Sequence, residues 1–529
     1  MATANQPPPL VGHNLFLENR PLVEALRREG GEWGHVQASD LGALLSGEPL
    51  EWARQANENP PRLRTHDRFG NRIDEVEFHP AWHRLMETSV GNGLCAISWD
   101  DPQPGAHVVR ATLFFLAAQV EQGHTCPLSM THAAVPALCA QPELAAAWEP
   151  LLCSREYDFG LRPAAEKRGA LCGMAMTERQ GGSDVRANTT SAVPIDGAYE
   201  LTGQKWFCSA PMCDVFLVLA QAPEGLSCFL LPRVLPDGTR NGFRIERLKD
   251  KLGDRSNASS EVEFERALAS LVGDEGRGVP TIIEMVNHTR LDCVLGSAAV
   301  MRACVEQTTH HAAHRLAFGR LLADQPLMQN VLADLCVESE AATLTALRLA
   351  GAYDRGERAL ARIATAIAKY WVCKRGPAHA AEALECLGGN GYVEESALPR
   401  FYRQQPLQSI WEGSGTVIRL DVLRALGRTT DTLHAFLGEC REAAGADARL
   451  DAWLAALEAD LVAPDEGGAR RLVERMGLAL QGSLLVRHGD PAVADAFCAS
   501  RLGDGGLAFG TLPSGVDAGA IVERHRPRL

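Results

Sequence analysis

The sequence predicts a mainly helical protein with a β-barrel in its middle. Apolar residues recur at helical spacing over most of the chain, and six short β-prone runs crowd into residues 171–265. Long apolar stripes of helical period return after residue 276. We therefore expect a helical domain at 1–170, a β-barrel at 171–275, a four-helix bundle at 276–429 and a helical extension at 430–529.

Composition sets the broad class. The 529 residues are 46% hydrophobic and 22% charged, which is typical of globular proteins and, at about 150 residues per domain, suggests three or four units. No apolar run approaches the roughly 18 residues of a membrane span, and the first residues lack the order of a secretory signal. A net charge of −14 opposes a surface coated with phosphate-binding residues. We expect a soluble, cytoplasmic protein whose 15 scattered cysteines are reduced.

The first 170 residues predict helices with irregular, proline-marked connections, including a buried helix at 109–122. The next segment changes period. Turn formers separate β-prone runs at 171–177, 199–209, 214–221, 226–231, 243–248 and 261–265. Short strands at this spacing predict a compact antiparallel barrel or sandwich.

The third segment predicts the bundle. Apolar residues after position 282 indicate one long helix to about Arg315, and Pro326 suits the first turn of the next helix. A third helix begins near Glu357 and meets a kink or break at Pro377. A fourth begins near Ser414.

A glycine-rich turn follows the first β-prone run, in the segment MTERQGGSD at 176–184. Such a turn lets main-chain N–H groups and a hydroxyl approach a phosphate or the polar edge of a ring. An ordinary β-turn explains the same residues when they are taken alone. The turn is not a P-loop, and no GxGxxG opens a helix, so neither nucleotide hydrolysis nor Rossmann binding is supported.

His310, His311 and His314 could suggest a metal site, because His310 and His314 share a helix face. A zinc site needs a third ligand and usually an acidic residue placed as in HExxH, which is absent here. Hydrogen-bonded helix histidines are therefore preferred, and no metal is expected. No G-x-S-x-G elbow occurs. Glu412, in the segment IWEGSGT at 410–416, is either a helix-start acid favoured by the helix dipole or a general base in an apolar cleft.

The ordered segments MTERQGGSDV, GQKWFCS, HRLAFGRLL, LGGNGY and WEGSG resemble the acyl-CoA dehydrogenase family over about 171–426. The SIWEGSG segment and the stretch at 509–517 are most similar to its AidB alkylation-response branch. This resemblance implies a helical domain, a β-barrel, a four-helix bundle and an extra helical domain. It also implies a FAD-dependent oxidoreductase that acts on an acyl-CoA and assembles as a homotetramer.

The resemblance assigns site residues one by one. Those implied to contact FAD are Met176, Thr177, Ser183, Phe207, Ser209, Arg315, Phe318, Gln329, Glu385, Gly388, Gly389, Ser414 and Thr416. Of these, Arg315 and Phe318 resemble residues that reach the cofactor of a neighbouring subunit. Arg290 and Trp411 are implied to lie beside the substrate.

Glu412 matches the family's commonest catalytic base, which removes the α-proton of an acyl thioester while the flavin accepts a hydride from the β-carbon. The family's alternative base position falls on Thr289, which cannot serve. Polarisation of the thioester oxygen and desolvation of Glu412 would both assist this proton transfer.

Four departures from the family pattern bear on this assignment. Pro326 stands where a Gln usually helps to hold the adenine, although Gln325 and Gln329 flank it, and Glu385 brings a negative charge near the FAD phosphates. Arg179 replaces a proline in the glycine-rich turn, and Trp411 suggests a narrow cleft.

Two functional hypotheses therefore stay open. One is ordinary metabolic dehydrogenation of an acyl-CoA. The other is an AidB-type flavoprotein with weak turnover that binds double-stranded DNA. Residues 430–529 hold ten Arg and no Lys against 15 acidic residues, which opposes broad phosphate attraction. The arginines nevertheless cluster, and we expect a DNA contact at Arg470, Arg471 and Arg475.

Overall fold

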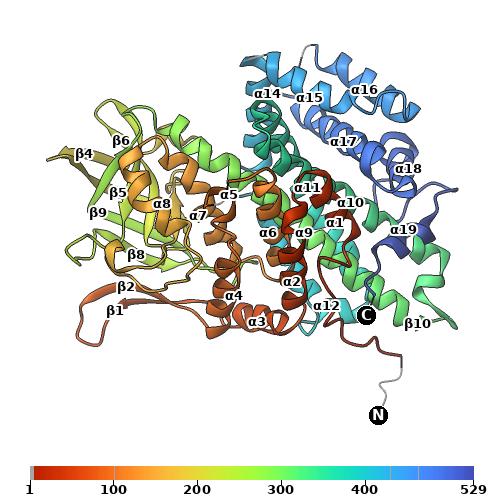
Figure 1. The fold of residues 1–529 in the computed structure, drawn as a ribbon, viewed down its shortest axis with the longest axis horizontal. Helices are drawn as coiled ribbons and strands as arrows, with labels where there is room; N and C mark the ends of the chain where they lie inside the picture. Colours follow the sequence, from red (N-terminus) through yellow and green to blue (C-terminus); the bar gives the residue numbers. More distant parts are fainter. Residues whose placement is uncertain (1–4, 101, 429, 463, 529) are drawn as a thin grey trace. The chain divides into compact units, whose positions relative to one another are not determined.

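The computed structural model describes residues 5–100, 102–428, 430–462 and 464–528. They form two compact units (Figure 1). The helical unit comprises Met1–Glu48, Pro104–Val120 and Arg290–Leu529, and the β unit comprises Pro49–Gln103 and Glu121–Thr289. The four predicted domains stay a prediction, since these units follow a different division.

The β unit is built on a seven-stranded sheet. Its strands are β3 (Cys172–Ala175), β4 (Ser191–Ile195), β5 (Ala198–Ser209), β6 (Val215–Ala222), β7 (Gly225–Pro232), β8 (Phe243–Leu248) and β9 (Ser259–Val272). The order is β3-β6-β4-β5-β9-β7, with β8 beside β9, and β6 also pairs with β7. The sheet therefore curls back on itself and fits the predicted barrel loosely, because β6 meets β4 at a single residue pair.

The sheet differs from the purely antiparallel arrangement expected from the sequence. β3 runs parallel to β6, with Cys172 opposite Val215. A parallel pair needs a long connection, which β4 and β5 provide here. β4 itself was not predicted, because its Pro194 lowers the strand signal of a short run that nevertheless pairs antiparallel with β5.

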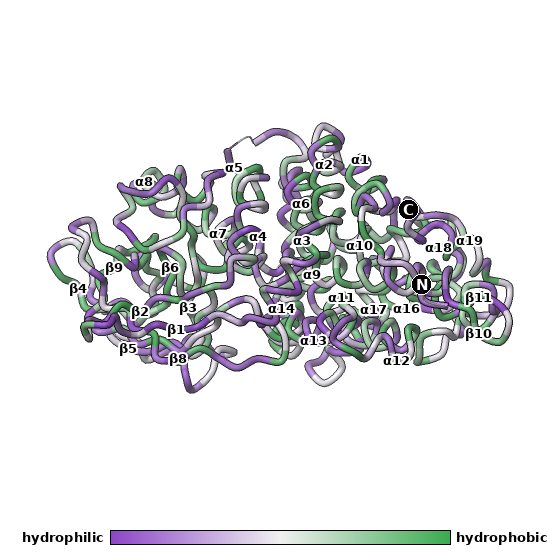
Figure 2. Tube along the Cα trace, turned by 90° about the horizontal axis from the view of Figure 1, so that it is seen from below, coloured by the Kyte–Doolittle hydropathy of each residue, from purple (hydrophilic) through white to green (hydrophobic). Residues whose placement is uncertain are grey.

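The rest of the β unit is mostly helical. It contains α3 (Glu48–Glu58), α4 (Pro80–Gly91), α5 (Ile97–Asp100), α7 (Thr125–Leu138) and α8 (Pro142–Leu152). The sequence analysis missed a hairpin of β1 (Arg62–His66) and β2 (Arg72–Glu77), drawn largely in hydrophilic purple in Figure 2. Asp67 closes its turn by accepting the N–H groups of Phe69 and Asn71 at 2.8 and 2.9 Å. That Asx turn was the overlooked signal.

The helical unit packs around three long helices, which are α10 (Pro326–Asp354), α11 (Arg358–Cys386) and α9 (Gly278–His314) from Arg290 onward. Its other helices are α1 (Arg20–Arg28), α2 (His35–Leu45), α6 (Ala106–Val120), α12 (Gly389–Tyr392), α13 (Leu398–Gln408), α14 (Gly415–Arg428), α15 (Thr430–Arg441), α16 (Ala448–Asp460), α17 (Ala469–His488), α18 (Pro491–Ala499) and α19 (Ala518–His525). A short hairpin of β10 (Leu316–Ala317) and β11 (Arg320–Leu321) follows α9. α10 is buried on nearly every side from Leu332 to Ala352, as expected for a helix enclosed by others.

The predicted helices are largely confirmed. α9 ends one residue before Arg315, Pro326 is in the first turn of α10, and α14 begins just after Ser414. Pro377 is not a break, because α11 continues through it to Cys386. The packing of α11 against α10 and α13 outweighs the main-chain hydrogen bond that the proline cannot make.

All 15 cysteines are free thiols, and all but Cys139 and Cys153 are buried. Burial raises the pKa of Cys208 and of Cys228 to about 12, so these thiols stay protonated and unreactive at neutral pH. Within the described ranges, no helix combines the length and hydrophobicity that a membrane crossing requires.

Candidate active site

A buried ion pair organises the glycine-rich turn of the β unit. Glu178 and Lys205 are both fully buried, and the Lys205 Nζ lies 2.9 Å from Glu178 Oε1. Thr189 and Thr190 each donate both an N–H and a hydroxyl to the same carboxylate, and Gln180 Nε2 donates to it at 2.7 Å. Burial would raise the pKa of Glu178, but these hydrogen bonds and the Lys205 charge outweigh it and hold the pKa at about 2. The turn is therefore held by a charged carboxylate at its base.

Two neighbouring donors, Asn188 and Trp206, hold the main chain of Met176 and Thr177. Asn188 Nδ2 donates to the Met176 carbonyl at 2.9 Å, and the Trp206 N–H donates to the Thr177 carbonyl at 2.8 Å. The structure thus brings the predicted residues Met176 and Thr177 beside strand β5.

Glycine is required at one point of this turn. A Cβ on Gly182 would lie 2.3 Å from Thr177 Oγ1, so no larger residue fits without moving that hydroxyl. The side chain of Ser183, the next residue, is exposed. The turn therefore offers an open main chain between two hydroxyl groups.

Strand β5 carries an exposed aromatic side chain next to this turn. Phe207 is 56% exposed, whereas its neighbour Cys208 is fully buried, as strand alternation requires. Lys249 Nζ lies 4.6 Å from the Phe207 ring centroid and 3.8 Å from that of Trp206. Ser209 ends the strand opposite Ser259 of β9. A planar ring system with polar edges fits such a surface of aromatic, hydroxyl and open main-chain groups.

In the helical unit, Glu412 has an unusual main-chain conformation. Its φ is +56°, in the left-handed region that residues with a Cβ rarely adopt, and Gly413 follows with φ +108°. Trp411 is held just before it, because its indole N–H donates to Gln408 Oε1 at 2.9 Å. A strained residue of this kind persists only where its surroundings hold it, and such residues concentrate at functional sites.

Two cations hold the Glu412 loop. Arg290 Nε donates to the Glu412 carbonyl at 3.1 Å, and the buried Lys369 Nζ donates to the Gly413 carbonyl at 2.5 Å. Arg290 is itself paired with Asp421 at 2.9 Å. Burial would raise the pKa of Asp421, but the charges of Arg290 and Arg362 outweigh it and lower that pKa. Arg290 therefore acts on the Glu412 main chain, and its predicted contact with substrate stays a prediction.

The predicted neighbour-reaching residues lie on the β10–β11 hairpin. Phe318 is 98% exposed, with φ +53°, and Leu316 and Leu327 nearby are 49% and 78% exposed. Arg315 donates to the main-chain carbonyl of Asn5, whose side chain exchanges two hydrogen bonds with the Leu316 main chain at 2.7 and 2.9 Å. Hydrogen bonds from Asn5 therefore hold the start of the hairpin in place. The sequence did not indicate this contact.

The remaining predicted cofactor residues are dispersed in the helical unit. Gly388 and Gly389 are exposed, and nothing lies within 4 Å of a Cβ placed on either. Glu385 is exposed near Glu382, whose pKa is raised by burial and then by the Glu385 charge. Gln329 is in the first turn of α10. Thr416 accepts a hydrogen bond from Arg419 at 2.9 Å.

The three predicted DNA-contacting arginines have different surroundings. Arg475 pairs with Asp460 and stacks 5.1 Å from the Trp453 ring centroid. Arg470 is exposed and donates through Nε to the Tyr370 hydroxyl at 3.1 Å. Arg471 is exposed. Arg475 therefore differs from Arg470 and Arg471, because Asp460 already neutralises its charge.

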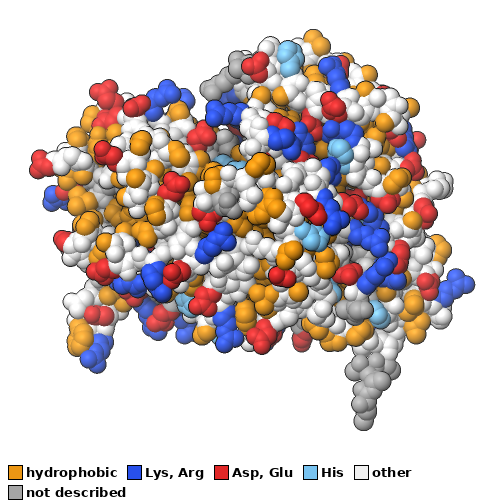
Figure 3. Space-filling model, in the orientation of Figure 1, with side chains coloured by type: hydrophobic (Ala, Val, Ile, Leu, Met, Phe, Trp, Pro, Cys, Tyr) orange, Lys and Arg blue, Asp and Glu red, His pale blue; other side chains and the backbone are white. Residues whose placement is uncertain are grey.

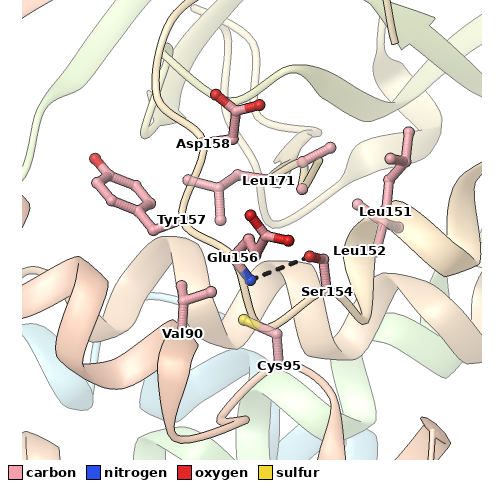
Figure 4. A pocket seen from close by; sticks show the side chains of 11 residues that line it. Val90, Cys95, Leu151, Leu152, Ser154, Glu156, Tyr157, Asp158 and Leu171 are labelled. Carbon is pink, nitrogen blue, oxygen red and sulfur yellow. Dashed lines mark hydrogen bonds between the residues drawn. The ribbon is translucent and has the colours of Figure 1, made fainter. Parts of the chain in front are cut away.

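Of two described cavities, neither is lined by a residue predicted to contact FAD or substrate. The cavity in Figure 4, lined by residues such as Cys95, Tyr157 and Leu171, has about 10 Å³, room for one water. A groove of about 450 Å³ in the helical unit is lined by Arg449, Trp453 and Arg475, among others. Both arginines are paired with aspartates there.

Three families match successive parts of the chain. The Adaptive response protein AidB N-terminal domain matches residues 5–159, the acyl-CoA dehydrogenase middle domain matches 173–267, and the acyl-CoA dehydrogenase C-terminal domain matches 276–427. The chain is also 46% identical over 502 residues to AidB of Escherichia coli (strain K12), with 93% of both chains covered. The chain belongs to the acyl-CoA dehydrogenase family, in its AidB branch.

Two comparisons with Caenorhabditis elegans proteins support the same family and fold. The acyl-CoA dehydrogenase family member 11 of Caenorhabditis elegans is 32% identical over 450 residues, which cover 80% of this chain and 72% of the relative. The crystal structure of C. elegans ACDH-11 in complex with C11-CoA superposes with a TM-score of 0.86 at 29% identity, covering 95% and 94% of the two chains. The predicted family and fold are confirmed, and the chain is an oxidoreductase of the acyl-CoA dehydrogenase type.

Several residues that hold the site were missed by the sequence analysis. Lys205 and Glu178 stand within the quoted motifs, but nothing in their spacing indicated that they pair. Lys369 lies in an apolar helical stretch, where a lone lysine at a buried position was the available signal.

Proposed function

We propose that this chain is a FAD-dependent acyl-CoA dehydrogenase-type enzyme in which Glu412 is the catalytic base. The observation that carries this proposal is the strained Glu412 loop, held at two successive carbonyls by Arg290 and Lys369. A base that must reach a weakly acidic α-C–H group benefits from such positioning. Glu412 takes the α-proton, and bound FAD would supply the acceptor for the β-hydride.

The residues proposed to hold FAD are those that the family pattern assigns. Met176, Thr177, Ser183, Phe207 and Ser209 supply the aromatic, hydroxyl and main-chain groups of the β unit. In the helical unit the proposed set is Arg315, Phe318, Gln329, Glu385, Gly388, Gly389, Ser414 and Thr416. The charge of Glu385 opposes a phosphate group nearby.

An acyl-CoA thioester is the proposed substrate, since the C. elegans homologue was crystallised with C11-CoA. Trp411, fixed by Gln408, suits a narrow site for the acyl group. The test is anaerobic mixing of the FAD-loaded protein with acyl-CoAs of increasing chain length. Bleaching of the flavin with at least one thioester is expected, and no bleaching with any of them would contradict dehydrogenation.

We also propose a homotetramer in which the β10–β11 hairpin reaches a neighbouring subunit. The exposed apolar residues Leu316, Phe318 and Leu327 support a buried interface there. Arg315→Ala is expected to weaken FAD binding about tenfold or more, the effect of losing one charge-assisted hydrogen bond. Arg441→Ala, which breaks an exposed pair with Glu458, is the control. A strictly monomeric protein in sedimentation, or equal FAD affinity of both variants, would contradict this proposal.

Weak, sequence-independent binding of double-stranded DNA in an alkylation response is the second candidate function. Arg470 and Arg471 are exposed, and among the described residues neither forms an ion pair with an acidic side chain, which favours this function. The face shown in Figure 3 mixes acidic and basic side chains around the carboxy-terminal helices, which limits the expected affinity.

Fluorescence anisotropy with a labelled duplex at two salt concentrations tests this function. Arg470/Arg471→Ala is expected to weaken binding and to reduce its salt dependence, because a protein with fewer phosphate contacts displaces fewer counterions from the DNA. Arg475→Ala is the matched control, since Asp460 already neutralises that arginine. Identical binding by the double variant and the wild type, or no binding at low salt, would exclude DNA contact here.

A further inference from the structure

Four cationic residues gather around Tyr370 in the helical unit. Arg470 Nε donates to the Tyr370 hydroxyl at 3.1 Å, and the Arg419 guanidinium lies 5.6 Å from the Tyr370 ring centroid. Lys374, one turn along α11, places its Cε 3.8 Å from where a Cβ on Gly415 would stand. Lys369 completes the group from the buried side. We call Lys374, Arg419 and Arg470 the Tyr370 cluster.

No carboxylate lies within ion-pair distance of these cations among the residues that the structure describes. This is unusual within the same unit, where comparable cations are neutralised: Arg290 and Arg362 by Asp421, Arg348 by Glu439 and Arg375 by Glu338. Burial lowers the pKa of Lys374, and the charges of Arg470, Arg419 and Lys369 lower it further. The cluster therefore bears a repulsion that a bound anion would relieve.

The amino end of α14 adds a second favourable element. α14 has 14 residues and begins at Gly415, where a Cβ would approach a Tyr370 ring carbon to 3.3 Å. The first N–H groups of a helix lack intrahelical acceptors and carry partial positive charge. Arg419 is oriented toward this end by its hydrogen bond to Thr416 Oγ1. Lys374 and Arg470 are exposed, so a ligand can reach them from solvent.

We propose that Lys374, Arg419 and Arg470 bind a phosphate group beside Tyr370. Three cations with hydrogen-bond donors match a compact dianion with several acceptor oxygens, and Arg supplies the planar donor pair that phosphate accepts best. A carboxylate carries one charge and would leave the cluster largely uncompensated. The chemical class is therefore a phosphate ester or pyrophosphate, carried either by a soluble compound or by a nucleic-acid backbone. The site does not depend on the proposed base, and it shares Arg470 with the proposed DNA contact.

Isothermal titration of the full-length, FAD-loaded protein with inorganic pyrophosphate at low ionic strength tests the site. Saturable binding at one site per chain is expected. Lys374→Gln and Arg470→Gln should each raise the Kd about tenfold or more, as expected for lost charge-assisted hydrogen bonds. Arg441→Gln, which removes an equal charge from the surface of α15 in the same unit, should leave the Kd within about twofold if recognition depends on geometry and not on net charge. Lys374 and Arg470 are exposed, and circular dichroism will verify that each variant is folded.

Three results would overturn the proposal: no binding by the wild type, equal weakening by Lys374→Gln and Arg441→Gln, or binding by FAD-stripped protein alone. The last would assign the cluster to the cofactor's own phosphates. Competition separates the two sources. Displacement of pyrophosphate by a 20-base-pair duplex, lost in Lys374→Gln, identifies a nucleic-acid backbone, whereas displacement by a soluble nucleotide without any effect of duplex identifies a small phosphate ligand.

Discussion

Glu412→Gln should leave the protein folded and yellow while acyl-CoA-dependent bleaching of the flavin falls by about two to four orders of magnitude. Glutamine preserves the volume and hydrogen-bonding capacity of the side chain but cannot accept the α-proton. The main-chain contacts of the loop, from Arg290 to the Glu412 carbonyl and from Lys369 to the Gly413 carbonyl, do not involve the altered group. Stopped-flow absorbance of the flavin under anaerobic conditions measures the rate.

Glu458→Gln provides the matched control, since it alters an exposed glutamate that pairs with Arg441 on the surface. Its bleaching rate should equal that of the wild type. A Glu412→Gln variant that bleaches at the wild-type rate would show that another group removes the proton, and it would leave the strained conformation of residue 412 as a structural feature only.

Glu178→Ala should destabilise the β unit by about 3–5 kcal/mol, the usual effect of leaving one member of a buried ion pair without its partner. Lys205 would keep a charge in a fully buried position, and Thr189 and Thr190 would lose their common acceptor. Amide hydrogen exchange in β4 and β5, together with urea unfolding, measures the loss. Glu200→Ala, which breaks an exposed pair with Arg266, should cost less than about 1 kcal/mol.

The same pair predicts acid sensitivity. The pKa of Glu178 is held at about 2, below its ordinary value of 4.5, so its contribution to stability is complete above pH 4.5 and declines as the pH falls toward 2. Burial lowers the pKa of Lys205 to about 8, and the pair is therefore doubly charged at neutral pH. Glu178→Ala should flatten the pH dependence of unfolding over this acidic interval. An unchanged profile in that variant would assign the acid sensitivity to other buried carboxylates.

Local signals were sufficient for most elements of the fold. The periodicity after residue 282 predicted α9, and the fixed φ of Pro326 together with its missing N–H marked the first turn of α10. Where the prediction left an alternative open or missed an element, non-local contacts decided. Pro377 stays inside α11 because neighbouring helices hold the segment, and β4 forms despite Pro194 because β5 offers it a partner.

In the candidate site, too, some residues could be predicted from the sequence and others could not. The motifs identified the residue types that carry the chemistry, with Glu412 as base and the glycine-rich turn as a binding element, because these depend on covalent identity and short spacing. The residues that hold these groups in place could not be predicted from the sequence. The partner of Glu178 is 27 positions away in the sequence, and the cations on the Glu412 loop come from helices more than 40 residues earlier.

By itself, the sequence determined the family, the order of helical and β segments and the identity of the proposed base, since each rests on patterns local to the chain. Only the tertiary structure decided which charges are compensated. Arg475 meets Asp460, whereas Arg470 meets Tyr370 and, within the described part of the chain, no carboxylate, although the two arginines are five positions apart on one helix. The reason is physical: charge compensation depends on distances of a few ångströms between side chains on different helices, and these distances are set by packing rather than by separation along the chain.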